Sequence, residues 1–196
     1  MKVKIAGTDE MVEVMQNETL YDLLKRYHKN DYFNYLGVKV NNKLKGLCSI
    51  DFKENDSIEF IDITNPDGHR IYVRTLSLIY VKACKEVYND IDVSINHSLN
   101  KGIYTELQYK HLVSKRHLQI IKNKMQEIID AHKPIVTNFL SVEKASEIFS
   151  AQGMTDKVEM LKYWTKDLIR VYELDGYYDT FYGYLAPNTG FVNKFD

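Results

Sequence analysis

The stretch TNPDGHR, residues 64–70, divides the sequence into two parts with different patterns. The Pro-Asp-Gly at its centre interrupts both helical and strand periodicity, because proline lacks a backbone donor and glycine adopts turn conformations at little cost. Short alternating runs precede it, and long helical patterns follow it. We therefore predict a first domain at residues 1–63, a linker at 64–69 and a second domain at 70–196.

The first part has the pattern of a β-grasp, or ubiquitin-like, fold. Val3 and Ile5 alternate with polar residues, and MVEVM alternates again after a Gly-Thr-Asp turn, which predicts a hairpin. In NETLYDLLKRYHKN the leucines share one helical face, and Asn17 or Thr19 can cap the helix. YLGVKV and IEFIDI then alternate as strands. Strands, one helix and further strands in this order are typical of a β-grasp unit.

The second part predicts a mixed α+β domain. A helix follows the boundary, with Leu76, Tyr80, Ala83 and Val87 spaced for one buried face. DVSINHS and GIYTEL alternate as two strands, and Ser114 can cap a second long helix. A short helix, SVEKASEIFSAQG, and a tail of strands separated by Asp-Gly and Pro-Asn-Thr-Gly turns complete the chain. The predicted class is thus α+β throughout.

Bulk composition excludes some classes of protein. The chain has 196 residues, a net charge of −1 and two cysteines, so no global field draws it to nucleic acid. Its longest apolar stretch, TLSLIYVKAC, is interrupted by a lysine and is too short to span a bilayer. We expect a cytoplasmic protein with reduced cysteines and no membrane partner.

The stretch INHSLNKGIYTEL, residues 95–107, contains the residues that most suggest chemistry. His97 and Ser98 are adjacent in a predicted strand, so their side chains point to opposite faces and a nucleophile–base pair is disfavoured. The spacing G-x-x-x-x-G-K-[ST] of a phosphate-binding loop does not occur in the chain. A hairpin turn is the simplest interpretation, although His97 and Lys101 could still line a cleft.

Metal and nucleic acid are the remaining ligand classes to consider. The six histidines form no i, i+3 or i, i+4 pair, and no C-x-x-C occurs, so we predict no metal site. The basic run YKHLVSKRHLQIIKNK could contact phosphates, or could be a solvated helix face balanced by Glu127 and Asp130. Its candidate contacts are Lys110, Lys115, Arg116, Lys122 and Lys124.

The sequence resembles the N-terminal half of threonyl-tRNA synthetases, in order and over essentially its whole length. VNNKLKGL and ENDSIEFI resemble the closing strands of their TGS domain, which is a β-grasp. INHSLNKGIYTEL lies where those enzymes have a Gly-Phe-Tyr hairpin, and IIKNKMQEIIDAHKPI with SVEKASEIFSAQGMTDKVEML resembles the helix pair that follows, including Lys157. YYDTFYGYLAPNTGFVNKF resembles the closing segment of the second additional domain, which edits mischarged tRNA.

The resemblance fails at the metal. Editing domains of these synthetases hold zinc with two histidines four apart and with a Cys and a His four apart. Aligning the chain on its hairpin and on PNTG places Arg74, Leu78, Phe181 and Leu185 at those positions. Leu and Phe cannot donate an electron pair to zinc. We therefore expect an editing-like fold without zinc and without zinc-dependent editing.

HSLNKGIY together with YYDTFYGYLAPNTGFVNKFD also resembles the N-terminal part of bacterial nucleoside kinases related to uridine kinase. This resemblance implies a P-loop kinase domain after Asp196 that would use ATP and magnesium, with no cofactor in the present chain. The leading prediction is a non-catalytic module that binds a ligand, RNA, tRNA or the kinase domain and regulates the kinase. The alternatives are a zinc-free deacylase of aminoacyl-tRNA using His97 or Lys157, and an RNA-binding module. The predicted cleft residues are His97, Lys101, Tyr104, Lys157, Tyr182 and Asn188.

Overall fold

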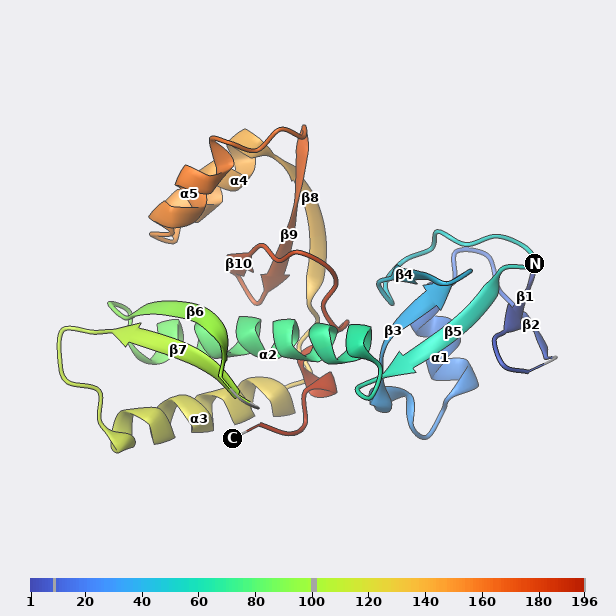
Figure 1. Cartoon of the computed structure of the whole chain (residues 1–196), viewed down its shortest axis with the longest axis horizontal. Helices are drawn as coiled ribbons and strands as arrows, with labels where there is room; N and C mark the ends of the chain where they lie inside the picture. The colour runs from blue at the N-terminus through green and yellow to red at the C-terminus, as the bar shows by residue number, and fades with distance from the viewer. Residues whose placement is uncertain (9, 100–101, 196) are drawn as a thin grey trace.

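The computed structural model describes residues 1–8, 10–99 and 102–195. For residues 97–99 it describes the backbone only. Helix α2 runs through the middle of the molecule, with the β-grasp unit at one end and the remaining elements along its length (Figure 1). The first elements are β1 (Lys2–Ile5), β2 (Met11–Glu13), α1 (Leu20–Tyr27), η1 (Tyr32–Asn34), β3 (Tyr35–Val40), β4 (Lys43–Lys45) and β5 (Ser57–Asp62). The later elements are α2 (Pro66–Val87), β6 (Asp92–Leu99), β7 (Gly102–Gln108), α3 (Lys115–Asp130), β8 (Val136–Ser141), α4 (Val142–Ala151), α5 (Thr155–Leu161), β9 (Leu168–Leu174), β10 (Tyr177–Asp179) and η2 (Thr189–Phe191).

The first elements form a mixed sheet in the order β2-β1-β5-β3-β4, with β1 and β5 parallel at its centre. Thr19 caps α1 through a capping box with Asp22, and the leucines of α1 are buried against the sheet. Asn41 and Asn42 turn β3 into β4 with positive φ angles of 48° and 63°, which asparagine tolerates. The predicted α+β class, with a β-grasp first, is confirmed.

Helix α2 begins earlier than the sequence predicts. Pro66 occupies its first turn, and the Asn65 side chain accepts a hydrogen bond from the Asp67 N–H at 3.0 Å. Residues 66–69, predicted as linker, therefore form a helical turn, because proline needs no partner at a helix start and asparagine is a strong cap. The helix also buries more of its surface than the predicted stripe, since strands, α3 and the chain end all pack on it.

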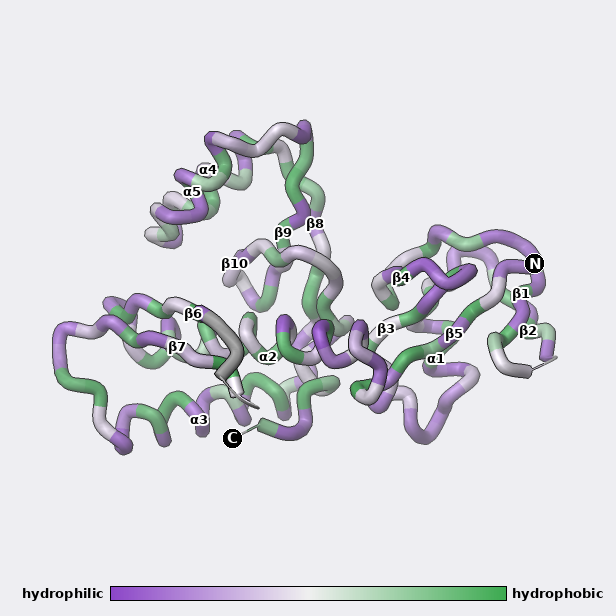
Figure 2. Tube along the Cα trace, viewed as in Figure 1, coloured by the Kyte–Doolittle hydropathy of each residue, from purple (hydrophilic) through white to green (hydrophobic). Residues whose placement is uncertain are grey.

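The hairpin β6–β7 and helix α3 lie along α2 (Figure 1). The sequence places Leu118, Ile121, Met125 and Ile128 of α3 on one helical face. The last three are buried, whereas Leu118 at the beginning of that face is 49% exposed. Hydrophobic and hydrophilic residues alternate along α3 in Figure 2, as expected for an amphipathic helix packed on one side.

A second, smaller sheet in the order β10-β9-β8 carries α4 and α5 (Figure 1). Its hydrophobic cluster centres on Phe149 of α4 with Ile169 and Val171 of β9. The predicted Asp-Gly turn lies between β9 and β10, with left-handed φ angles at Asp175 and Gly176. Strand β8 and helix α5 were not predicted, and they form one side of the site described below.

The main hydrophobic cluster continues from the β-grasp unit into the rest of the chain. The ring of Phe191 lies 5.8 Å from that of Tyr21 and 5.0 Å from that of Phe33. The Asn188 amide donates a hydrogen bond to the Tyr21 hydroxyl at 3.0 Å. The chain end thus fixes the β-grasp unit against α2. Within the described residues, no helix has the length and hydrophobicity required to cross a bilayer.

Candidate functional site

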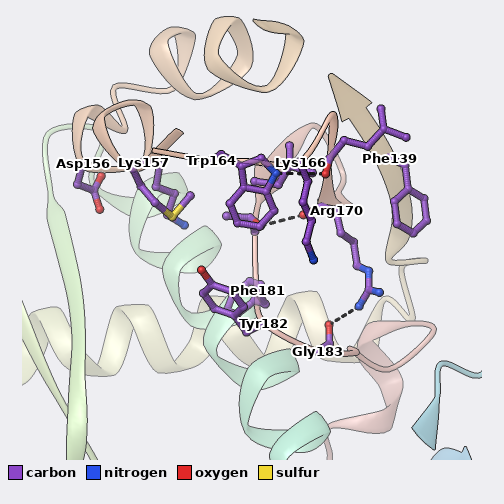
Figure 3. A pocket seen from close by; sticks show the side chains of 13 residues that line it. Phe139, Asp156, Lys157, Trp164, Lys166, Arg170, Phe181, Tyr182 and Gly183 are labelled. Carbon is purple, nitrogen blue, oxygen red and sulfur yellow. Dashed lines mark hydrogen bonds between the residues drawn. The ribbon is translucent and has the colours of Figure 1, made fainter. Parts of the chain in front are cut away.

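A hollow of about 470 Å³ opens between α5, β9 and the segment that follows β10 (Figure 3). This volume lies in the range of small-molecule and cofactor sites. We call it the aromatic pocket, because four aromatic side chains contribute to its wall. It is lined by Phe139, Asp156, Lys157, Met160, Trp164, Lys166, Leu168, Ile169, Arg170, Thr180, Phe181, Tyr182 and Gly183.

Two of the four aromatic side chains of the pocket are mostly exposed, whereas Trp164 and Phe181 are half-buried. Phe139 on β8 is 61% exposed and Tyr182 is 78% exposed, whereas large aromatic side chains usually lie in a hydrophobic core. Trp164, the only tryptophan of the chain, is fixed by a hydrogen bond from its indole N–H to the Leu168 carbonyl at 3.2 Å. Exposed rings of this kind offer flat apolar surfaces on which a planar ligand can stack.

Cations outnumber acids in the pocket wall. Lys157, Lys166 and Arg170 contribute positive charge, and Asp156 is the carboxylate among the lining residues. The Arg170 guanidinium lies between two rings, 5.6 Å from the centre of Phe139 and 4.6 Å from that of Tyr184. The pocket therefore combines positive charge with aromatic surface, which suits an anionic ligand that carries a planar ring.

Lys157 and Asp179 form a buried ion pair beside the pocket. The Lys157 ammonium group contacts a carboxylate oxygen of Asp179, whose residue is only 3% exposed. Burial lowers the pKa of Lys157 to about 8. The Asp156 carboxylate acts in the opposite direction, because a neighbouring negative charge favours the protonated amine. The first turn of α5 thus places a titratable amine in the wall of the pocket.

The turn around Gly183 closes the pocket on the side of α2. Its carbonyl accepts hydrogen bonds from Arg170 Nη1 at 3.0 Å and from the Tyr172 hydroxyl at 2.6 Å. Gly183 has a φ of +109°, which a residue with a Cβ adopts only with strain. The atoms nearest to the place that a Cβ would occupy belong to the guanidinium of Arg74. The two hydrogen bonds hold this turn in place, and its backbone conformation requires glycine at position 183.

The structure separates the predicted cleft residues. Lys157 and Tyr182 line the aromatic pocket together. Asn188 instead caps η2 and contacts the β-grasp unit, and Tyr104 lies on β7 outside the pocket lining. Lys101 and the side chain of His97 lie outside the part of the chain that is described. A ligand role for each of these residues stays a prediction.

The predicted basic face of α3 is partly neutralised. Lys110 pairs with Asp90 at 2.7 Å, and Lys124 pairs with Glu127 at 2.7 Å. Lys115 and Arg116 are exposed in the first turn of α3, and Lys122 is half-buried. These ion pairs favour the interpretation of a solvated face over that of a continuous phosphate-binding surface.

The four positions that the resemblance aligns with zinc ligands carry side chains that do not suit the metal. Leu78 and Leu185 are buried in the main hydrophobic cluster, and the Phe181 ring packs on Tyr172. Arg74 is a cation, which a metal ion would repel. Among the described residues, no three His, Cys, Asp or Glu side chains come together as ligands. The donor set is thus incompatible with a zinc centre at this place.

Sequence reasoning missed Phe139, Trp164 and Arg170. The last two belong to the stretch YWTKDLIR, residues 163–170, in which two aromatic residues precede two basic ones. That composition is a usable signal for a stacking surface beside cations, but Phe139 comes from a strand that was not predicted.

Comparison with known proteins shows that the sequence is similar to part of several threonine–tRNA ligases. No family model matches the chain. It is 24% identical to a threonine–tRNA ligase of Oleidesulfovibrio alaskensis over all 196 residues, which is 30% of that enzyme. It is 30% identical to the threonine–tRNA ligase of Ehrlichia chaffeensis over 182 residues, covering 86% of this chain and 29% of the ligase.

A third relative, the threonine–tRNA ligase of Francisella tularensis subsp. novicida, is 26% identical over 141 residues, covering 72% of this chain and 22% of the ligase. The chain is therefore homologous to the N-terminal region of threonine–tRNA ligases. It spans less than a third of the length of these curated relatives. They are ligases rather than nucleoside kinases, so the kinase parent stays a prediction from sequence.

Proposed function

We propose that this chain is a tRNA-binding module whose aromatic pocket receives the single-stranded acceptor end of tRNA. The observation that carries the proposal is the combination of exposed rings and cations in one pocket, in a chain homologous to part of a tRNA ligase. Single-stranded nucleic acid is bound in this way elsewhere, with bases stacked on aromatic side chains and phosphates near cations.

The only tryptophan of the chain provides a direct test, because Trp164 lies in the pocket wall. An RNA minihelix ending in single-stranded CCA should quench its fluorescence, whereas the same duplex with a blunt end should quench it much less. Each stacked base contributes about 1–3 kcal/mol, so Tyr182→Ala or Phe139→Ala should weaken binding by roughly tenfold. Both side chains are mostly exposed, so neither change should unfold the protein.

Tyr163→Ala is the matched control. Tyr163 is 83% exposed and precedes Trp164, but it does not line the pocket. We expect less than a twofold change in affinity for this variant. Equal affinity of the two pocket variants and the wild-type protein, or equal affinity for the blunt duplex, would contradict the proposal.

A second function, hydrolysis of an aminoacyl ester at the RNA end, is favoured by the Lys157–Asp179 pair. A neutral Lys157 amine could accept a proton from water as it attacks the ester carbonyl, releasing amino acid and the RNA 3′-hydroxyl. Because burial lowers the pKa of Lys157 to about 8, the rate should rise as the pH passes from 7 to 9. Release of labelled amino acid at the uncatalysed rate, or equal release by Lys157→Met, would exclude this activity.

A further inference from the structure

Two arginines from distant parts of the sequence converge on the turn at Gly183. Arg74 comes from α2 and Arg170 from β9. A Cβ atom on Gly183 would lie 2.7 Å from Arg74 Nη1, and the Gly183 carbonyl lies 3.0 Å from Arg170 Nη1. Both guanidinium groups thus lie against one residue at the rim of the aromatic pocket.

Neither arginine has an acidic partner among the described residues. The Arg74 side chain makes no hydrogen bond or ion pair there, and the Arg170 guanidinium donates one hydrogen bond, to the Gly183 carbonyl, while it lies over the rings of Phe139 and Tyr184. The Arg170 Nε atom is buried without a partner. Burial, together with the neighbouring Arg70, lowers the pKa of Arg74. A partly buried guanidinium group without a carboxylate partner is stabilised when an anion binds it.

We propose that Arg74 and Arg170 form an anion site for a backbone phosphate of the RNA strand whose terminal base enters the aromatic pocket. This inference rests on the proposed function and names the contact that fixes the strand at the rim. Guanidinium groups present paired N–H donors that match phosphate oxygens. Arg170 and Gly183 belong to the pocket wall, so the phosphate site and the stacking surface are continuous.

The site also gives a role to a position where editing domains have a metal ligand. The resemblance aligns Arg74 with one of the zinc ligands of those domains. A metal ligand donates an electron pair to a cation, whereas the Arg74 guanidinium is itself a cation and repels one. A cation at this place can attract the phosphate directly, without a metal between protein and ligand. The glycine at 183 leaves the room that the Arg74 guanidinium occupies.

Inorganic phosphate tests the anion site without RNA. Increasing phosphate at constant ionic strength should raise the melting temperature of the wild-type protein and leave that of Arg74→Gln unchanged. Arg70→Gln is the matched control, because Arg70 lies one turn earlier on α2 and pairs with Asp67 at 2.6 Å in an exposed position. It should respond like the wild type. No phosphate effect in the wild type, or the same effect in Arg74→Gln, would overturn the anion site.

Binding of the CCA-ended minihelix then connects the site to RNA. Arg74→Gln should weaken binding by about tenfold and lower the slope of log affinity against log salt by about one, as loss of one phosphate contact predicts. Arg74→Lys should keep most of the salt slope but lose affinity, since an ammonium group cannot form the paired contact. If Arg74→Gln left RNA binding unchanged, the phosphate contact would be overturned but the proposed function would stand. A wild-type protein that responds to phosphate but binds no RNA would exclude the proposed function and the RNA phosphate, leaving a site for free phosphate.

Discussion

Replacing Gly68 by alanine should destabilise the protein, although the same change in an ordinary helix stabilises it. Gly68 lies in the first turn of α2 and is buried. An added Cβ would lie 1.9 Å from the backbone carbonyl oxygen of Asp62 and 2.8 Å from its carbonyl carbon. Ordinary contacts to a Cβ begin at 3.4 Å, so α2 and the end of β5 would have to separate by about 1.5 Å.

The corner between β5 and α2 has little freedom to accept that movement. The Asp62 carbonyl accepts a hydrogen bond from Asn65 N–H at 3.3 Å, and its carboxylate accepts hydrogen bonds from the backbone and hydroxyl of Thr64. Alanine gains about 1 kcal/mol over glycine in helix propensity. Overpacking costs roughly 1–3 kcal/mol and more where backbone must move, so we expect a net loss of about 2 kcal/mol. For a chain of this length that lowers the melting temperature by roughly 4–8 °C.

Thermal unfolding of Gly68→Ala followed by circular dichroism measures this loss. His69→Ala, at the next residue, is the control, because His69 is exposed and its change should stay within about 0.5 kcal/mol. If Gly68→Ala instead raised the melting temperature, the close approach of α2 to Asp62 would be refuted.

Three further predictions concern α2. Ellman's reagent should label one thiol in the native protein and two after unfolding, because Cys48 is exposed and Cys84 is fully buried; equal rates would contradict this. Burial raises the pKa of the Cys84 thiol from 9.0 to about 12, so the folded state holds this proton more tightly. The contribution of this tighter proton binding to the free energy of unfolding is complete well below pH 9 and is lost as the pH rises towards 12. Urea unfolding should show about 2 kcal/mol less stability at pH 10.5 than at pH 9, a loss that Cys84→Ala should reduce. Finally, the Thr75 hydroxyl accepts the Ala186 N–H at 2.9 Å, so Thr75→Val should cost about 1–3 kcal/mol in urea unfolding, whereas a cost below 0.5 kcal/mol would argue against that bond.

Local signals in the sequence were sufficient for most of the fold. Caps at Thr19, Ser114 and Ser141, and a left-handed glycine at Gly153, mark helix ends by chemistry that acts within a few residues. The alternating strands of the β-grasp likewise carry their own register. Helix α5 lacks such signals, because it has seven residues and no side-chain cap, so packing on α4 and β9 and the Lys157–Asp179 ion pair stabilise it.

The stretch TNPDGHR shows that proline and glycine do not always interrupt a helix. Proline and glycine within TNPDGHR predict a linker when each is considered by itself. With Asn65 before it as a cap, Pro66 starts a helix instead, and Gly68 permits that helix to approach β5. The second fact depends on a contact with Asp62, and periodicity cannot show how closely two backbones approach.

The aromatic pocket could not be assembled from local spacing, because its walls come from β8, α5, β9 and the segment after β10. Resemblance named Lys157 and Tyr182 but could not name the side chains that face them. The contacts between α2 and the closing segment explain how the pocket keeps its shape. Leu78 of α2 and Leu185 of that segment are buried in the main hydrophobic cluster, and the Thr75 hydroxyl accepts a hydrogen bond from the Ala186 N–H. Because these contacts hold the closing segment on α2, they also keep the turn at Gly183 against Arg74.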